Sequence, residues 1–290
     1  MSEHKHSEKV ERQLPILRED CTRVIGQPFK HFLCPILLDD EPVPLCLGHI
    51  INEACPNSFN GCVVQRSDVD GFYGSLVESD FTSNIQARSM GGPEKALRDS
   101  ALRKKMGLTF VVDGKELKHY EYRGVDVPGH TPIAMHIGEG EPLQLVMKKT
   151  QEELDALMER GLEIKVGNDC RMSSVVTLVK AAYLALFRLL GYSYAISPAG
   201  RRIGHEILGK FYRAHGHNIR EAKKAALEFF RPYVNIMRTI DRFNGKQPIG
   251  TIEDQVGKAC TTPSGKLFGL IVFIRTDTHF FAVLMRMPFG

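Results

Sequence analysis

The longest apolar stretch of the sequence, Val175 to Leu190, restricts the possible folds more than any other feature. Lys180 and Arg188 interrupt it, and it is shorter than the roughly 20 residues that a helix needs to span a bilayer. We therefore expect a helix from about Ser174 to Leu190 that is buried on nearly all sides, with no membrane as a partner. Gly191 is a suitable place for this helix to stop.

The cysteines indicate the redox environment of the chain. There are seven of them among 290 residues. An odd number, in a chain long enough to form a core without covalent cross-links, favours reduced thiols and a cytoplasmic location. The polar start, Met1 to Lys9, has no apolar stretch behind it, so we expect no secretory signal. The net charge of +4 permits contact with nucleic acid without requiring it.

The remaining pattern predicts an α+β protein in which strands pair as hairpins and helices form a layer. Asp113-Gly114 separates strand-like runs at 108–112 and 118–122, and an Asp-Gly pair is typical of a tight hairpin turn. A second hairpin is predicted from the runs at 267–274 and 280–287. Further strands are expected at 132–137 and 143–148, and helices at 93–105, 151–160, 199–214 and from Asn218 to about Arg231.

Changes in composition along the chain divide it into three expected segments. Residues 1–27 are a partly flexible lead-in, in which residues 11–25 form either a weak helix or an extended stretch. Residues 28–92 form a small loop-rich module, because Cys, Pro, Gly and Asn are dense there. Residues 93–290 form a larger mixed α+β domain with the two hairpins and the helical layer.

The small module contains an ordered series of short motifs. They are Cys34-Pro35-Ile36-Leu37, Leu45-Cys46-Leu47-Gly48-His49-Ile50-Ile51, the Asn57 to Asn60 loop, and a stretch that ends in Asp68-Val69-Asp70-Gly71-Phe72-Tyr73-Gly74. In this order the motifs resemble the core of an HNH endonuclease of the ββα-metal, treble-clef type, over about residues 32–81. The resemblance implies a small ββα module near the N-terminus, followed by the larger mixed domain.

The resemblance also implies an activity, that of a metal-dependent nuclease or a descendant of one, acting on nucleic acid and on DNA rather than RNA. His49 matches the general base that activates water, and Asn57 or Asn60 matches the residue that orients it. Asp70 matches a ligand of the divalent cation, Mg²⁺ or Mn²⁺, on the closing helix. Asp68 could approach the same cation from a loop, and a helix cap or a turn is the alternative role of this acidic pair.

The sequence departs from the family pattern at two places. Gly48 stands where many members carry Asp or Glu as a metal ligand. The two Cys-x-x-Cys pairs that hold a structural zinc ion in the family are reduced to Cys34-x-x-Leu37 and Arg66-x-x-Val69, so the usual four-thiolate site cannot form from them. Membership of the family and catalytic activity are therefore separate questions.

A different set of side chains could bind a structural Zn²⁺ ion. Cys46 and His49 have the spacing of a zinc knuckle, and Cys34 and Cys55 could complete a tetrahedron. This set would remove His49 from catalysis and would make the chain a noncatalytic, zinc-stabilised protein that binds nucleic acid or a partner protein. The simpler alternative is that the cysteines between 34 and 62 are small buried hydrophobic residues.

Basic residues recur between 201 and 224, over two predicted helices. Arg201, Arg202 and Lys210, together with Arg66 in the small module, are candidate contacts to the phosphates of a nucleic acid. A solvated helix face is the alternative explanation for the run.

Overall fold

The computed structural model divides the chain into two compact units. The first contains residues 1–82 and 170–290, and the second contains residues 83–169. The structure describes residues 2–55, 61–88, 108–112, 114–121, 133–137, 144–146, 159–161, 163–166, 171–233, 239–241, 256–261, 267–275 and 280–286. This division differs from the boundary expected at residue 92, because the chain after residue 170 returns to pack against the N-terminal part.

The first unit begins with helix α1, Ser2–Ile25, so residues 11–25 are helical rather than extended. Cys21 is buried on its inner side. The carboxylate of Asp20 accepts a hydrogen bond of 2.7 Å from the backbone N–H of Tyr192, which is 172 residues away in the chain. This contact ties the expected lead-in to the C-terminal helices of the same unit.

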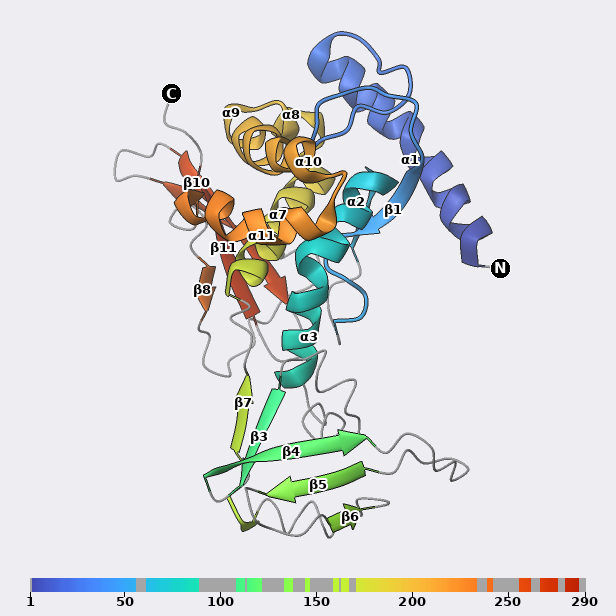
Figure 1. The fold of residues 1–290 in the computed structure, drawn as a ribbon. Coiled ribbons are helices and arrows are strands. Elements are labelled where there is room, and N and C mark those ends of the chain that lie inside the picture. Colours follow the sequence, from blue (N-terminus) through green and yellow to red (C-terminus); the bar gives the residue numbers. More distant parts are fainter. Residues whose placement is uncertain are drawn as a thin grey trace. The chain divides into compact units, whose positions relative to one another are not determined.

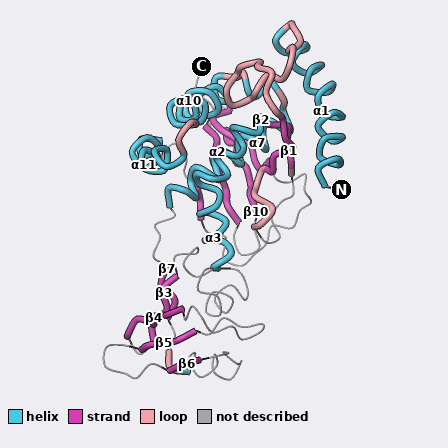
Figure 2. The backbone as a smooth tube through the Cα atoms, turned by 45° about the vertical axis from the view of Figure 1, so that its right-hand side comes forward, coloured by secondary structure: helices cyan, strands magenta, loops and turns pink. Residues whose placement is uncertain are grey.

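A small antiparallel sheet and a helix follow as one ββα unit. Strands β1 (Leu45–His49) and β2 (Cys62–Arg66) pair so that His49 lies opposite Cys62. Helix α2 (Ser67–Tyr73) starts directly after β2 and packs against both strands (Figure 2). The chain then continues as the π-helical turn η1 (Gly74–Glu78) and helix α3 (Ser79–Arg88).

Helix α7, Arg171–Leu190, confirms the buried helix that the apolar run predicts and begins three residues earlier. Every side chain from Val175 to Phe187 is buried. The hydroxyl of Tyr183 donates a hydrogen bond of 2.6 Å to the backbone carbonyl of Pro35, which fixes α7 to the loop before β1. None of the helices in the described residues is both long enough and apolar enough to cross a membrane.

Short helical segments follow α7. They are α8 (Tyr192–Ala195), α9 (Pro198–Gly200), the π-helical η2 (Arg201–Gly209), α10 (Lys210–His215), α11 (Ile219–Phe230) and the 3-10 turn η3 (Arg231–Tyr233). The stretch expected as one helix, 199–214, is therefore helical throughout, with a π-helical segment inside it. Helix α11 begins where it is predicted to begin, because the side chain of Asn218 accepts hydrogen bonds from the backbone N–H groups of Arg220 and Glu221.

The first unit also contains an antiparallel sheet with the strand order β8-β11-β10-β9. Its strands are β8 (Thr239–Asp241), β9 (Val256–Thr261), β10 (Leu267–Arg275) and β11 (Phe280–Arg286). The pairing of β10 with β11 confirms the second predicted hairpin. Helix α7 packs against these two strands (Figure 1). The sheet therefore covers part of the longest apolar helix.

The second unit contains an antiparallel sheet with the order β6-β5-β4-β3-β7. Its strands are β3 (Leu108–Val112), β4 (Lys115–Glu121), β5 (Ile133–Ile137), β6 (Gln144–Val146) and β7 (Glu163–Val166). Val112 pairs with Lys115, and Gly114 has a φ of 75°, which confirms the first predicted hairpin. The helix expected at 93–105 and all but the last two residues of that at 151–160 lie outside the described residues. Helices together with antiparallel sheets make the fold α+β.

Candidate functional site

The ββα unit places His49 at the end of β1 and Asp70 within α2. The Sγ atom of Cys46, on β1, is 3.8 Å from Oδ2 of Asp70, so strand and helix face each other at this point. The His49 side chain is 27% exposed, and its Nε2 atom lies 3.5 Å from a carboxylate oxygen of Glu53. The asparagines expected to orient His49 fall in residues 56–60, outside the described residues.

The carboxylate of Asp70 is bound by the ammonium group of Lys180, which comes from the middle of α7. The Nζ atom is 3.1 Å from Oδ1 of Asp70, and it also donates a hydrogen bond to Glu78 at the end of η1. Lys180 is completely buried and Glu78 almost completely. Burial alone would lower the pKa of Lys180, but attraction to the two carboxylates outweighs burial and raises the pKa. We call Lys180, Asp70 and Glu78 the Lys180 cluster.

The π-helical turn η1 explains how Asp70 and Glu78 reach the same ammonium group. Two residues that are eight apart in a regular α-helix point about 80° away from each other around the helix axis. A π-helical turn contains more residues than an α-helical turn, so it absorbs about one residue and returns the two side chains to one face. Neither Glu78 nor Lys180 is among the site residues predicted from the sequence. The available signal was a lysine inside an otherwise apolar helix.

The position directly before His49 has no space for a side chain. A Cβ atom at Gly48 would clash with Nε2 of Gln65 and would lie 3.0 Å from Cγ of Asp70. Gln65 is buried, and neither its amide nitrogen nor its amide oxygen has a hydrogen-bond partner in the part of the chain that the structure describes. The amide of Gln65 therefore fills the space that a side chain at position 48 would occupy.

These contacts do not fit a divalent cation at Asp70. Among the described residues, no three His, Cys, Asp or Glu side chains gather closely enough to bind a metal ion. Asp68, the expected second ligand, is held instead by Arg66 and by the hydroxyl of Tyr212. Contrary to the expectation, Asp68 and Asp70 do not share a site, because they face different partners from one short helix.

The side chains expected to hold a structural Zn²⁺ ion do not converge. The Sγ atom of Cys34 accepts a hydrogen bond of 3.4 Å from the backbone N–H of Leu37. The thiol of Cys55 lies 3.5 Å from the hydroxyl of Thr82, on a different element. Burial raises the pKa of Cys34 to about 12 and that of Cys46 to about 11. Cys34 and Cys55 are instead small buried residues.

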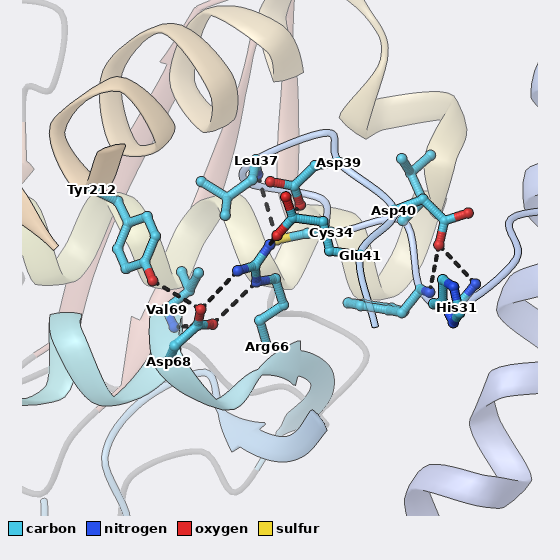
Figure 3. Close-up of polar contacts among 12 residues, drawn as sticks. His31, Cys34, Leu37, Asp39, Asp40, Glu41, Arg66, Asp68, Val69 and Tyr212 are labelled. Atoms are coloured by element: carbon cyan, nitrogen blue, oxygen red, sulfur yellow. Dashed lines mark hydrogen bonds and ion pairs between the residues drawn. The ribbon is translucent and has the colours of Figure 1, made fainter. Parts of the chain in front are cut away.

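Arg66 lies where the second pair of zinc-binding cysteines begins in the family. Its Nη1 atom is 2.9 Å from carboxylate oxygens of Asp39 and Glu41, and its Nη2 atom is 2.7 Å from Asp68 (Figure 3). The hydroxyl of Tyr212, from α10, donates a further hydrogen bond of 2.9 Å to Asp68. We call these five residues the Arg66 network. The Arg66 side chain is only 7% exposed. The prediction that Arg66 contacts phosphates is therefore wrong, because its guanidinium group is enclosed by carboxylates.

Apolar residues stand at the last positions of the Cys34-x-x-Leu37 and Arg66-x-x-Val69 patterns. Leu37 and Val69, at the two final positions of the reduced pairs, are both buried. The turn that begins at Cys34 is closed by a hydrogen bond of 2.7 Å from the backbone N–H of Leu38 to the Cys34 carbonyl. Leu38 has a φ of 55°, a left-handed conformation that costs a non-glycine residue about 1 kcal/mol. The turn thus keeps its shape through packing and hydrogen bonds.

Asp40 fixes the start of the same loop. Its carboxylate accepts hydrogen bonds of 2.7 and 2.8 Å from the backbone N–H groups of His31 and Phe32 (Figure 3). Burial would raise the pKa of Asp40, but the hydrogen bonds from the backbone outweigh it and lower the pKa. The loop that carries Asp39 and Glu41 to Arg66 is therefore held in place from its other side.

Helices η2, α10 and α11 and the first residue of η3 carry a net positive charge. Residues 201–231 contain eight arginines and lysines and only three acidic residues, an excess of five that is larger than the net charge of +4 of the whole chain. All eight side chains are exposed, and we call them the basic helix surface: Arg201, Arg202, Lys210, Arg213, Arg220, Lys223, Lys224 and Arg231. The three residues expected to contact phosphates in this region are therefore accessible.

No family model matches the chain, and no curated protein or solved structure is significantly similar to it.

Proposed function

We propose that this protein binds nucleic acid, DNA in preference to RNA, through the basic helix surface. The observation that carries the proposal is the concentration of exposed arginine and lysine side chains in residues 201–231. Such side chains bind phosphates mainly by Coulombic attraction and by release of the counterions that surround the nucleic acid. The preference for DNA follows from the resemblance of the small module to HNH endonucleases.

In this proposal the chain is a descendant of those nucleases that retains binding and has lost the catalytic cation. Residues 28–92 are its HNH-like module, and the larger mixed domain supplies the binding surface. A descendant would keep the order strand, strand, helix, with His49 and Asp70 on the elements where the family has them. The contact between Lys180 and Asp70 is what such a descendant would acquire when it no longer binds a metal ion.

Fluorescence anisotropy with a labelled DNA duplex, and with an RNA duplex of the same sequence, tests the proposal. We expect saturable binding that is tighter for DNA and that weakens as salt is added. The double variant Arg201→Ala/Arg202→Ala should bind more weakly, and the slope of log K against log salt should fall by about 2, one unit for each lost phosphate contact.

The matched control removes two exposed basic residues elsewhere in the first unit, Arg12 and Lys30. The variant Arg12→Ala/Lys30→Ala should keep the salt slope of the wild type. Equal losses in the two double variants would place the binding surface elsewhere. Absence of saturable binding by the wild-type protein would contradict the proposed function itself.

Metal-dependent cleavage with His49 as general base is the second candidate function. It is favoured by the partial exposure of the His49 imidazole, at the end of the strand that faces α2. Cleavage would use Mg²⁺ or Mn²⁺, and Asp70 is available to such an ion only after Lys180 releases it. A plasmid nicking assay on wild type and His49→Ala tests this candidate. Nicking that needs the metal and is lost in the variant would support it, and nicking by both proteins would not.

We place this activity in the cytoplasm. The described cysteines 21, 34, 46 and 55 form no disulfide, although three of them are deeply buried and would be well protected if they were paired. Reduced thiols of this kind are typical of a reducing compartment. Fractionation of cells that produce the tagged protein would test the location.

A further inference from the structure

We infer that the ammonium group of Lys180 takes the place of a metal ion between the carboxylates of Asp70 and Glu78. The protein therefore binds a divalent metal ion at these two carboxylates only when Lys180 is removed. The inference concerns the ββα unit and α7 and does not depend on nucleic-acid binding. Its starting point is the disagreement between the cation that the HNH resemblance implies at Asp70 and the side chains that surround Asp70 in the structure.

The geometry of Lys180 is that of a bridging cation. Its Nζ atom contacts carboxylate oxygens from two successive elements, Asp70 in α2 and Glu78 in η1. It also lies 5.9 Å from the centre of the Tyr73 ring, where the electron-rich face attracts a positive charge. An ammonium group has three N–H donors and no acceptor, so it can satisfy several negative groups at once, as a metal ion does.

The charges in the cluster show why a metal ion could replace Lys180. Two carboxylates share one ammonium group, which leaves an excess of negative charge in a buried site. Removal of Lys180 would leave two carboxylates with no cation, and burying an uncompensated charge is strongly unfavourable. A divalent cation with oxygen ligands would relieve that cost.

Two ligands for such a cation are already in place. Asp70 and Glu78 supply the carboxylate oxygens that now contact Nζ of Lys180, and water would supply the remaining ligands. In the wild-type protein the ammonium group of Lys180 and the amide of Gln65 fill the space around Asp70. If Lys180 forms only an ordinary structural ion pair, the result is different. Loss of Lys180 then destabilises the fold, and metal ions restore none of the lost stability.

Thermal unfolding in EDTA and in millimolar Mn²⁺ separates these two explanations. We expect the melting temperature of the wild type to be the same in both solutions. Lys180→Ala should melt at a lower temperature in EDTA and should regain on the order of 5 °C in Mn²⁺, as a cation that binds only the folded state does. Electron paramagnetic resonance of free Mn²⁺ should show one bound ion per chain in this variant.

The matched control is the triple variant Lys180→Ala/Asp70→Asn/Glu78→Gln, which keeps the cavity and removes the charges. It should gain nothing from Mn²⁺. If Lys180→Ala is unfolded in EDTA, far-UV circular dichroism takes the place of the melting curve. Folding on addition of Mn²⁺ then supports the inference, and a chain that stays unfolded contradicts it.

The wild-type protein provides the opposite test. Stoichiometric Mn²⁺ binding by the wild type that is lost in Asp70→Asn would overturn the inference, because Lys180 would then not exclude a cation. A folded Lys180→Ala protein with no Mn²⁺-dependent gain would overturn it as well. Neither result would affect the DNA-binding proposal, whose test uses variants of the basic helix surface.

Discussion

The Arg66 network and the Lys180 cluster both gather carboxylates around a protein cation, but they differ in their access to water. The carboxylates around Arg66 are partly exposed, at 25% for Asp39, 57% for Glu41 and 41% for Asp68. Lys180 is 0% exposed, its partner Glu78 is 7% exposed, and only Asp70, at 27%, reaches water. The same arrangement thus occurs once near the surface and once largely in the core.

The difference teaches that the two cations stabilise the fold by different means. Carboxylates that reach water can be hydrated when their partner is lost, so exposed ion pairs contribute little. Buried carboxylates cannot be hydrated, so loss of their partner lowers the free energy of unfolding strongly. The type of cation in each cluster agrees with this difference in exposure. The planar guanidinium of Arg66 meets several carboxylates spread over a loop, whereas the compact ammonium of Lys180 fits a closed site.

The largest expected effect is that of Lys180→Ala, which should lower the free energy of unfolding by about 3 to 5 kcal/mol, because it leaves Glu78 buried without a partner. Urea denaturation in EDTA would measure it. The double variant Lys180→Met/Glu78→Leu removes both charges and fills the space with apolar groups, so it should recover most of the loss. A loss below about 1 kcal/mol for Lys180→Ala would mean that the core cluster behaves like a surface ion pair.

Arg66→Ala should have a smaller effect, roughly 2 kcal/mol, because its three carboxylates can turn to water while the buried part of the arginine leaves a gap. Arg66→Lys is the matched control. It keeps the charge but loses the forked contact with Asp68, so its stability should lie between those of Arg66→Ala and the wild type. If Arg66→Ala were as destabilising as Lys180→Ala, the comparison between surface and core would fail.

Gly48→Ala probes the space beside the Lys180 cluster. The new methyl group would meet the amide of Gln65, and displacement of that buried side chain should cost about 1 kcal/mol. In a Gln65→Ala background the cost should be smaller, because only the contact with Asp70 remains, and a double-mutant cycle would detect the difference. Gly71→Ala is the control within α2, where a Cβ atom meets nothing within 4 Å. It should be slightly stabilising, because alanine favours a helix.

The elements that the sequence predicts correctly are those whose cause is local. The apolar run from Val175 predicts α7, the side chain of Asn218 predicts the start of α11, and the Asp113-Gly114 pair predicts a hairpin. In each case the residues that determine the structure are neighbours in the chain. The HNH resemblance, rather than a local pattern, implies a strand for His49 and a helix for Asp70, and the structure has them on β1 and α2. The roles given to these residues stay predictions.

The site itself depends on contacts that no local pattern contains. Lys180 and Asp70 are 110 residues apart, and Arg66 and Asp39 are 27 apart. From sequence alone Lys180 was only an interruption of an apolar helix. The π-helical turn that aligns Asp70 with Glu78 has no sequence signature, because it arises when a helix must fit an extra residue against a packed neighbour.

The smallest expected effect is a difference in pH dependence between the two regions. Burial would raise the pKa of Asp68, but Arg66 and Tyr212 outweigh it and lower the pKa, so Asp68 stabilises the fold above its unfolded pKa of about 3.9 and this contribution is lost as the pH falls further. The raised pKa of Lys180 gives the opposite dependence of stability on pH. Its contribution is complete below an unfolded pKa of about 10.4 and is lost only as the pH rises above it. Urea denaturation across the pH range would show both changes, as an acid limb and an alkaline limb of the plot of stability against pH. Asp68→Asn should flatten the acid limb alone, by less than about 1 kcal/mol because Asp68 is partly exposed. Lys180→Met/Glu78→Leu should flatten the alkaline limb, and it also removes the pH dependence that the raised pKa of Glu78 contributes at lower pH. If Asp68→Asn changed the alkaline limb as well, the Arg66 network and the Lys180 cluster would be one coupled system rather than two independent clusters.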